Sequence, residues 1–464
     1  MRKVSSIVIL AMAAVLLFGN QANAYAAAVN GDKYSKIDQY LEKECKAAHL
    51  PGMAVVLVDK DKVLFSSTYG NCTSLDAPFF IGSNSKSFTA VSILQLVEQG
   101  KIELDASIST YLPNANEGDK ITVRQLLNHT SGIRTYDTQK HYKVSSGQGT
   151  HVYANTNYGL LGQIVEAVSG SSYCDYVSTN IFQPLGMSHS FTSLEEAKKN
   201  GLITGYRNYF GLMLPEELPY PDVKARGWVS IPAGYLLSSA SDMGRYLQFY
   251  LRGGENILQP ESIQSMFGDS VKISSDREYG FGWGIRKDYP EMVISHNGLV
   301  ENYSANMFIL PDSGIAGVIL MNMNDYLVAD DMTGMILHSV LEMLFDKAPV
   351  YIKDYSYLQK HLLMDGLYLL LVVLCILPIL FFRRWKKAMK NGKKTGVILS
   401  FLFFHILLPT ILLLVPVIVA TPMFVIKAFV PDLYLVLVGG AAVAYGVGLF
   451  KIIYILKTKK VSKH

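Results

Sequence analysis

A serine and a lysine three residues apart, Ser83 and Lys86, open an apolar stretch, "GSNSKSFTAVSILQLVEQG". On a helix, positions i and i+3 share one face, so the lysine amine can reach the serine hydroxyl. Burying an ammonium is costly unless it is paired or loses its proton. A lysine with a lowered pKa could accept the serine proton and activate the serine as a nucleophile. The alternative is a surface serine followed by a lysine whose amine extends to solvent.

Two tyrosine–asparagine motifs could supply partners for that lysine. In Tyr153-Ala154-Asn155, the tyrosine is a second candidate base, because a nearby ammonium favours the phenolate. The Asn155 amide offers both a donor and an acceptor. A helical pattern follows this motif directly, which places it at a helix entrance. The second copy, Tyr206-Arg207-Asn208, is predicted to be a turn with structural aromatic residues.

A histidine and a glycine near the end of a strand-like run form the third motif, His296-Asn297-Gly298 in "ISHNGLVENYSA". The glycine would let a substrate backbone approach closely. A lone histidine is more often structural than catalytic, so this motif gains meaning only together with the other two.

The three motifs, in this order, resemble the serine β-lactamase and penicillin-binding-protein superfamily, and within it the class C-like branch. Further matches are "LLNHTSGI", "QGKIELDASISTYLP", "PAGYLLSSASDMGRY" and "YGFGWG", and the resemblance covers roughly residues 33–345. It implies an α+β fold, in which an antiparallel sheet is flanked by helices and carries an all-helical lobe. The active site is expected between the sheet and the lobe.

The resemblance also implies roles for individual residues. Ser83 would be the acylated nucleophile, and Lys86 and Tyr153 would share the acid–base work, with the choice of base left open. Asn155 would contact Lys86 and the substrate amide. The backbone N–H groups of Ser83 and Leu299 would form the oxyanion hole.

The third motif departs from the family pattern. His296 stands at the basic position of a Lys- or His-x-Gly triplet, and a histidine is expected to be neutral near neutral pH. Asn297 replaces a Thr or Ser whose hydroxyl helps to hold a substrate carboxylate. Both changes argue against a β-lactamase, although Gly298 is retained. They leave D,D-carboxypeptidase, endopeptidase, aminopeptidase and esterase activities open.

The order of predicted elements agrees with one sheet completed by both ends of the domain. An amphipathic helix, "DKYSKIDQYLEKECKAAHL", is followed by two strands around residues 59–62. Helical patterns dominate from about 95 to 225, and strand-like runs return late in the domain. A closing helix is expected at about 329–345.

The two ends of the chain indicate secretion and membrane anchoring. Residues 1–24 read as a signal peptide, with Arg2 and Lys3, an apolar run and an Ala-x-Ala site. Three later apolar runs are long enough to cross a bilayer. Basic residues concentrate in the first loop between them and in the tail, which places both in the cytoplasm. The expected organisation is a signal peptide (1–24), a hydrolase domain (25–350), a transmembrane helix (361–382), a basic loop (383–396), two further transmembrane helices (397–420 and 433–456) and a tail (457–464).

Charge separates the outer domain from the cytoplasmic segments. The chain has a net charge of +4, but residues 25–360 contain 27 Lys and Arg against 36 Asp and Glu, a net charge of −9. No basic stripe suggests nucleic-acid binding. We expect no cofactor or metal, and the sequence does not define the oligomeric state. Three outer cysteines, Cys45, Cys72 and Cys174, allow one disulfide at most.

The membrane segment suggests a narrower resemblance. A class C-like domain followed by three helices is similar to colibactin-type prodrug peptidases, which remove an N-acyl-D-amino-acid cap, and "NMN" at residues 322–324 fits their pattern. The expected function is a membrane-anchored extracytoplasmic serine hydrolase that cleaves a peptide or amide, at a D-residue, in cell wall or in a secreted peptide. Alternatives are a β-lactamase or esterase, a β-lactam sensor without turnover, or a binding module on an inactive scaffold.

Overall fold

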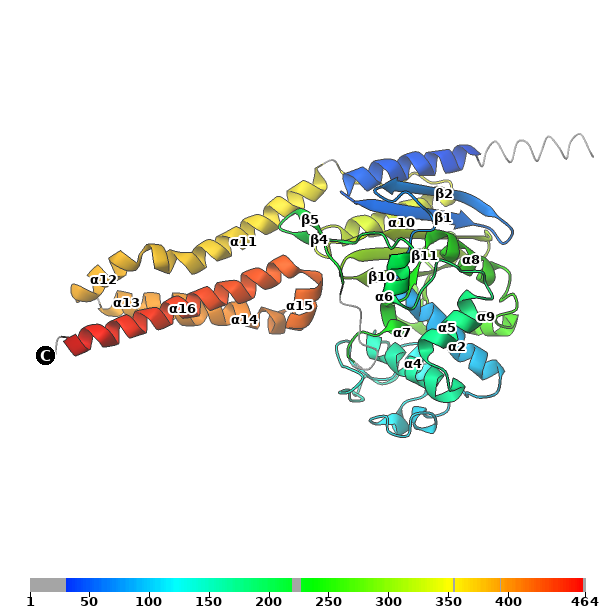
Figure 1. The fold of residues 1–464 in the computed structure, drawn as a ribbon, viewed down its shortest axis with the longest axis horizontal. Helices are drawn as coiled ribbons and strands as arrows, with labels where there is room; N and C mark the ends of the chain where they lie inside the picture. The colour runs from blue at the N-terminus through cyan, green and yellow to red at the C-terminus, as the bar shows by residue number, and fades with distance from the viewer. Residues whose placement is uncertain (1–30, 219–226, 354, 393, 462–464) are drawn as a thin grey trace, which may run out of the picture.

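An eight-stranded antiparallel sheet forms the centre of the folded domain (Figure 1). The computed structural model describes residues 31–218, 227–353, 355–392 and 394–461, so the expected signal peptide lies outside the described residues. Strands from the two ends of the domain are neighbours, with Val55 opposite Ile319. In sheet order the strands are β2 (Val63–Gly70), β1 (Gly52–Val58), β12 (Ile315–Met321), β11 (Tyr303–Leu310), β10 (Val293–Val300), β9 (Gly284–Arg286), β8 (Arg277–Tyr279) and β7 (Val271–Lys272).

Both faces of this sheet are covered, as the central strand β1 shows. All seven residues of β1 are buried, and the six from Met53 to Val58 divide between two apolar cores with the period of two that a strand imposes. Val55 and Leu57 pack in the core formed with the helix over residues 31–47 and with α10 (Asp330–Leu344). Val56 and Val58 pack in the core on the opposite face, which the remaining helices complete.

The core that contains Val56 and Val58 continues into a helical lobe. In sequence, the helices of this lobe come after β2 and before the late strands of the sheet. The arrangement is the α+β fold expected from the sequence, and both the early hairpin and the closing helix are confirmed. The helices of this part are α2 (Ser85–Glu98), α3 (Val123–Leu127), α4 (Asn155–Ser169), α5 (Tyr173–Val177), α6 (Leu194–Lys199), α7 (Ile231–Gly234), α8 (Ala240–Leu251) and α9 (Pro260–Gly268).

One local prediction was wrong. Residues 206–208 were expected to form a turn, but they belong to the strand β4 (Tyr206–Tyr209). β4 pairs in parallel with β13 (Met323–Asn324) and antiparallel with β5 (Leu212–Pro215). The turn lies one step later, at Phe210 and Gly211 between β4 and β5, and the added pairing with β13 is long-range, which local sequence patterns do not reveal. A further short pair joins β3 (Phe79–Phe80) to β6 (Leu237–Ser238).

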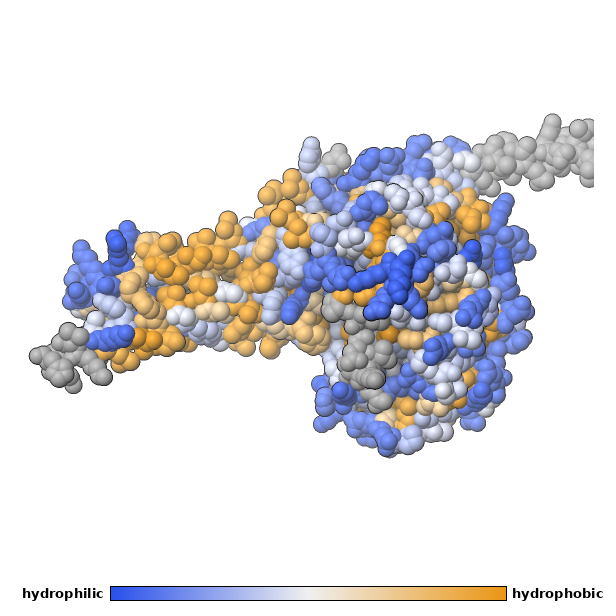
Figure 2. All heavy atoms as spheres, viewed as in Figure 1, coloured by the Kyte–Doolittle hydropathy of each residue, from blue (hydrophilic) through white to orange (hydrophobic). Residues whose placement is uncertain are grey.

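Three long apolar helices extend away from the folded domain as a bundle (Figure 1). By length and composition, the helices over Ser356–Leu380, Lys394–Ile418 and Pro431–Thr458 could each cross a membrane. Figure 2 shows hydrophobic residues over the length of this bundle and hydrophilic ones at its far end. The segments are α11 (Ser356–Leu380), α12 (Phe382–Lys390), α13 (Lys394–Leu402), the π-helical turn η6 (Phe403–Leu407), α14 (Leu408–Ile418), α15 (Met423–Phe429) and α16 (Pro431–Val461).

The basic segment expected as a loop at 383–396 is largely helical, because α12 occupies most of it. Five of the nine residues of α12 are Lys or Arg, and none is acidic. The buried Trp385 faces the bundle, so α12 is amphipathic. An amphipathic helix with this composition is suited to lie along a membrane surface.

The bundle is docked on the folded domain through the connection between its second and third long helices. The Arg207 guanidinium donates to the carbonyls of Lys427 and Ala428, at 2.8 and 2.7 Å, at the end of α15. The Trp228 and Phe424 rings lie 5.6 Å apart, in an edge-on arrangement. These contacts tie β4 and the segment before α7 to the same short helix.

A second set of contacts joins α11 to the folded domain. His361 of α11 lies 2.8 Å from Asp325, measured from Nε2 to Oδ2. The Tyr357 hydroxyl donates to the same carboxylate at 3.2 Å. The three side chains are buried together, so α11 is fixed to the domain where it begins.

The four cysteines of the chain are all unpaired. Cys45 and Cys72 are buried in the folded domain, on opposite sides of the central sheet, and Cys375 is buried in the bundle. The single disulfide that the sequence allowed is therefore not formed, and the fold is held by apolar packing and hydrogen bonds.

Candidate active site

Ser83 lies in a tight turn, η1 (Gly82–Asn84), that leads directly into α2. Gly82 has a φ of 54°, in the left-handed region that favours glycine. Asn84 and the first ten residues of α2 are buried, whereas Ser83 is half-buried. The Ser83 hydroxyl is therefore the side-chain group of this turn that a substrate can reach.

Lys86, one turn along, is fully buried beside that serine. Its Nζ atom lies 3.0 Å from Ser83 Oγ, 2.8 Å from Asn155 Oδ1 and 2.6 Å from the carbonyl oxygen of Ala233. Burial disfavours the charged form and lowers the pKa of Lys86 well below its usual range. The alternative of a lysine extending to solvent is excluded by this placement.

The three partners of Lys86 fix the direction of its lone pair. The Asn155 amide oxygen and the Ala233 carbonyl can only accept hydrogen bonds, so they take two N–H groups. A neutral amine has only two N–H groups, and its remaining tetrahedral position then points at Ser83 Oγ. This geometry lets the serine donate its proton to the amine, which is the arrangement that a general base requires.

Tyr153 completes the group, immediately before α4. Lys86 Nζ lies over the Tyr153 ring, 4.8 Å from its centroid. Burial raises the pKa of the phenol, and a hydrogen bond with Ser83 only partly offsets this rise. Tyr153 is therefore protonated at neutral pH, and its hydroxyl can relay a proton between Ser83 and a bound group without first ionising.

His129, which had no assigned role in the sequence, supports the Tyr153 motif from behind. Its ring centroid lies 4.5 Å from that of Tyr153. The Nδ1 atom faces the Ala154 amide at 3.3 Å and the Asn157 side-chain amide at 2.9 Å, so Nδ1 accepts from both. His129 is fully buried and has a positive φ of 59°, an uncommon conformation for a non-glycine residue.

His296 faces the same group from β10, and both of its ring nitrogens are occupied. Nδ1 lies 2.6 Å from the Asn297 carbonyl oxygen, so Nδ1 carries the proton and donates it. Nε2 lies 3.0 Å from the Tyr279 hydroxyl and accepts from it. Burial, with a smaller effect of the Lys86 charge, lowers the pKa of His296 to about 3. The basic position of the triplet therefore holds no charge.

Two glycines bring β10 into backbone contact with the turn that carries Ser83. A Cβ atom on Gly298 would lie 2.0 Å from the carbonyl oxygen of Ile81, and one on Gly82 would lie 2.4 Å from the amide nitrogen of Leu299. No side chain fits in either place. The backbone N–H groups of Ser83 and Leu299 therefore belong to adjacent peptide segments, as a two-donor oxyanion hole requires.

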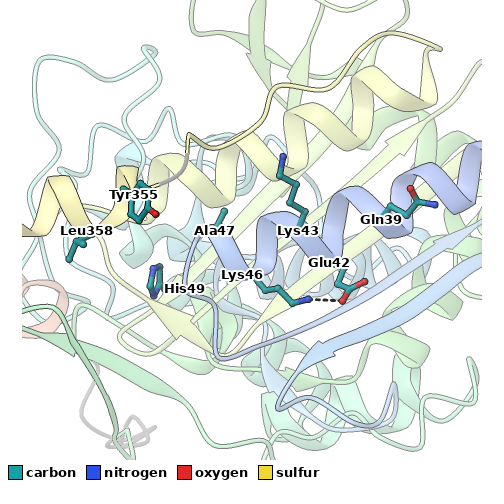
Figure 3. A pocket seen from close by; sticks show the side chains of 8 residues that line it. All are labelled: Gln39, Glu42, Lys43, Lys46, Ala47, His49, Tyr355 and Leu358. Carbon is teal, nitrogen blue, oxygen red and sulfur yellow. Dashed lines mark hydrogen bonds and ion pairs between the residues drawn. The ribbon is translucent and has the colours of Figure 1, made fainter.

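A cavity of about 510 Å³ opens beside these residues, with Tyr153, His296 and Leu299 in its wall. A larger cavity of about 740 Å³ lies elsewhere, between the helix over residues 31–47 and the start of α11 (Figure 3). Its lining includes the Lys46–Glu42 ion pair, at 2.7 Å, and the side chains of Tyr355 and Leu358, but no Ser, Thr or Cys. This cavity contains none of the residues that the sequence singled out.

The structure thus brings all seven residues singled out in the sequence to one place, and the second Tyr-x-Asn copy lies in a separate small sheet. Sequence reasoning missed the Ala233 carbonyl, His129 and Tyr279. All three lie in stretches that carried the family resemblance, "PAGY", "LLNHTSGI" and "YGFGWG", and this was the available signal. Among the described residues, no group of three or more His, Cys, Asp or Glu could hold a metal ion.

Comparison with known proteins identifies the fold and relatives of the chain. The Beta-lactamase family model matches residues 37–340. Protein flp of Staphylococcus aureus is 27% identical over 335 residues, and the match spans 64% of each protein, so the chain covers under two thirds of that relative. An octameric penicillin-binding protein homologue from Pyrococcus abyssi is similar in structure, with 26% identity, a TM-score of 0.60 and coverage of 70% of this chain and 80% of that one. A class C beta-lactamase shares the fold, with 20% identity, a TM-score of 0.58 and coverage of 68% and 96%.

Proposed function

Because the chain belongs to the beta-lactamase family, we propose that it is a membrane-anchored serine hydrolase that forms an acyl-enzyme on Ser83 and cleaves a peptide or amide bond. The observation that carries this proposal is the position of the Lys86 amine, with two carbonyl acceptors and the Ser83 hydroxyl as its three neighbours. Such an arrangement supports a role for the Ser83 hydroxyl as a nucleophile with the Lys86 amine as its base.

Acylation follows from this geometry. Ser83 Oγ attacks the substrate carbonyl carbon as its proton passes to the Lys86 lone pair. The carbonyl oxygen becomes an oxyanion, which the N–H groups of Ser83 and Leu299 stabilise. The carbon–nitrogen bond then breaks, and the leaving amine receives the proton from Lys86 by way of the Tyr153 hydroxyl. The product of this half-reaction is an ester on Ser83.

Deacylation uses the same groups in reverse. Water attacks the ester carbonyl and gives a proton to neutral Lys86. The second oxyanion forms in the same pair of N–H groups, and Ser83 Oγ leaves and takes the proton back. Atoms and charges balance over the cycle, so the chain's own residues suffice for hydrolysis.

The substrate is proposed to be a peptide or amide with a D-residue at the scissile bond, in cell wall or in a secreted peptide, as the family resemblance implies. The neutral His296 supports a substrate without a carboxylate at that position, because both ring nitrogens are already bonded. For a β-lactam, whose carboxylate needs such a partner, this environment is unfavourable.

The folded domain is proposed to lie outside the cytoplasmic membrane. Three apolar helices and the basic α12 between the first two support this orientation, because basic connecting segments remain in the cytoplasm. The proposed organisation is the one expected from the sequence, with the domain outside and the tail inside.

Labelling by a fluorescent fluorophosphonate tests the proposal. The full-length wild type should be labelled, and Ser83→Ala should lose the label. Ser92→Ala is a matched control, since Ser92 is a buried serine of the same helix whose hydroxyl donates to the Phe88 carbonyl. Equal labelling of wild type and Ser83→Ala would exclude the assignment. Turnover of D,D-dipeptides, N-acyl-D-amino amides, β-lactams and short esters by the wild type would then identify the substrate class.

A further inference from the structure

A lysine is buried in the apolar bundle, at the end far from the folded domain. Lys451 of α16 is 2% exposed. Its Nζ atom lies 2.9 Å from His405 Nε2, and His405 Nδ1 lies 2.8 Å from the Ala444 carbonyl oxygen. The Ala444 carbonyl can only accept, so Nδ1 carries the histidine proton and Nε2 accepts from Lys451.

The hydrogen-bond donors of the Lys451 ammonium are therefore not all paired. An ammonium has three N–H donors, and His405 takes one of them. Within the described part of the chain, Lys451 makes no ion pair, and its Nζ atom lies 5.0 Å from the centroid of the Trp385 ring, which is its cation–π partner. A positive charge buried among apolar helices without an anion is costly, and such residues are candidates for function.

Trp385 adds a second unsatisfied donor at the same place. Its side chain is 7% exposed, and its Nε1–H has no hydrogen-bond partner. The Phe382 ring stacks on it at 5.6 Å, and the Tyr454 ring of α16 meets it edge-on at 6.5 Å. A buried N–H without an acceptor is uncommon in folded proteins, so the indole N–H is a candidate donor to a bound group.

The surroundings define the chemistry of that partner. Lys386 Nζ lies 4.7 Å from the centroid of the Tyr454 ring, next to Trp385, and α12 contributes five positive charges and no acid. Apolar side chains of α16 are exposed on both sides of Lys451, for example Leu449 and Leu456. A ligand that matches these surroundings has an anionic head group rich in hydrogen-bond acceptors, together with acyl chains.

We propose that Trp385, Lys386, Lys451 and Tyr454, with His405 behind them, form a binding site for the phosphate of an anionic phospholipid. Basic residues between transmembrane helices are suited to this head group. The N–H donors alone would bind any anion, including free phosphate. A phospholipid also has acyl chains that would cover the exposed leucines beside the site. The inference rests on the proposed insertion of the bundle in a bilayer, not on the catalytic assignment.

Lipid binding to the full-length protein tests the site. The wild type, purified in detergent, is titrated with phosphatidylglycerol, with phosphatidylcholine and with inorganic phosphate, and binding is measured by native mass spectrometry and by the shift of the unfolding temperature. Phosphatidylglycerol should bind more tightly than phosphatidylcholine. Lys451→Gln should weaken phosphatidylglycerol binding about fivefold or more, and Trp385→Phe, which keeps an aromatic ring but removes the N–H, about threefold.

Lys457→Gln is the matched control, because Lys457 is an exposed lysine of the same helix. Its effect should be smaller than about twofold, and fluorophosphonate labelling of Ser83 should be unchanged in all three variants. Equal binding of both lipids by the wild type, an equal loss in Lys457→Gln, or displacement of the lipid by inorganic phosphate would overturn the inference. If Lys451→Gln does not fold, Trp385→Phe and the wild-type lipid comparison decide. Incorporation of the wild type into nanodiscs tests bilayer insertion separately.

Discussion

The amide of Asn155 offers the sharpest test of which group is the base. In Asn155→Ala, Lys86 loses the acceptor that lies 2.8 Å from its Nζ atom and keeps the Ala233 carbonyl. A hydrogen bond to a charged group contributes about 1.5–3 kcal/mol, against about 0.5–1.5 kcal/mol for a neutral donor. The loss therefore disfavours the ammonium more than the amine, by about 1 to 1.5 kcal/mol.

This difference corresponds to a further fall of about one unit in the pKa of Lys86, which burial has already lowered. Acylation needs the neutral amine, so its rate rises with pH through the pKa of Lys86. In Asn155→Ala the acid limb of the pH profile should move about one unit to lower pH. The plateau should also fall, by about tenfold to a hundredfold, because the lone pair is no longer held toward Ser83.

The rate constant of fluorophosphonate labelling, measured between about pH 5 and pH 10, reports both effects. Asn155→Asp is the paired variant, because a carboxylate beside Lys86 should raise the pKa of the amine and move the limb to higher pH. If Tyr153 acted as a phenolate base beside a permanent Lys86 ammonium, Asn155→Ala would leave the limb in place. An unmoved limb, or one moved to higher pH, would therefore refute Lys86 as the base.

Two further predictions concern β10. Gly298→Ala should reduce the labelling rate by about a hundredfold or more with the fold retained, because its Cβ would press on the Ile81 carbonyl, 2.0 Å away, and separate the two oxyanion donors. Gly334→Ala, in open space on α10, should label at the wild-type rate, and similar rates for the two variants would contradict the assignment. Because the pKa of His296 is about 3 when folded and near 6.5 when unfolded, this residue destabilises the protein as pH falls below 6.5. His296→Gln, whose side chain can still accept from Tyr279, should therefore lose about 2 kcal/mol less stability than the wild type between about pH 7 and pH 5, measured by thermal unfolding, and an identical loss would show that His296 does not titrate this way.

The Ser83–Lys86 pair could be foreseen because its geometry is local, whereas the other candidate site residues were foreseen from motifs that resemble a known family. Ser83 and Lys86 are one helical turn apart, so their 3.0 Å contact follows from the helix itself. The order of strands and helices predicted a sheet joined by both ends of the domain, and apolar run lengths predicted the three long helices. In these cases, the feature that was predicted depends on the spacing, order or length of segments along the chain, which can be read directly from the sequence.

The parts that could not be foreseen depend on distant backbone or on tautomers. The Ala233 carbonyl lies 147 residues from Lys86 and has no side-chain signature, so the family-like stretch "PAGY" marks its place but not its contact with Lys86. The tautomer of His296 is set by the Asn297 carbonyl and the Tyr279 hydroxyl, which only the folded chain brings together. Residues 206–208 form a strand because they pair with β5 across the turn at Phe210 and Gly211, and Tyr206 also pairs with Met323, a partner that no local pattern indicates.

The contacts of Arg207 and Trp228 with α15 have a consequence for access to Ser83, the proposed nucleophile. A domain on a flexible linker samples many heights above a membrane, but this one is fixed to a short helix of the bundle that we propose as its anchor. With the helices in a bilayer, Ser83 stays at one fixed height. Under the proposed function, a substrate is then selected by its position as well as by its contacts in the site. Its scissile bond must reach the height of Ser83 above the membrane.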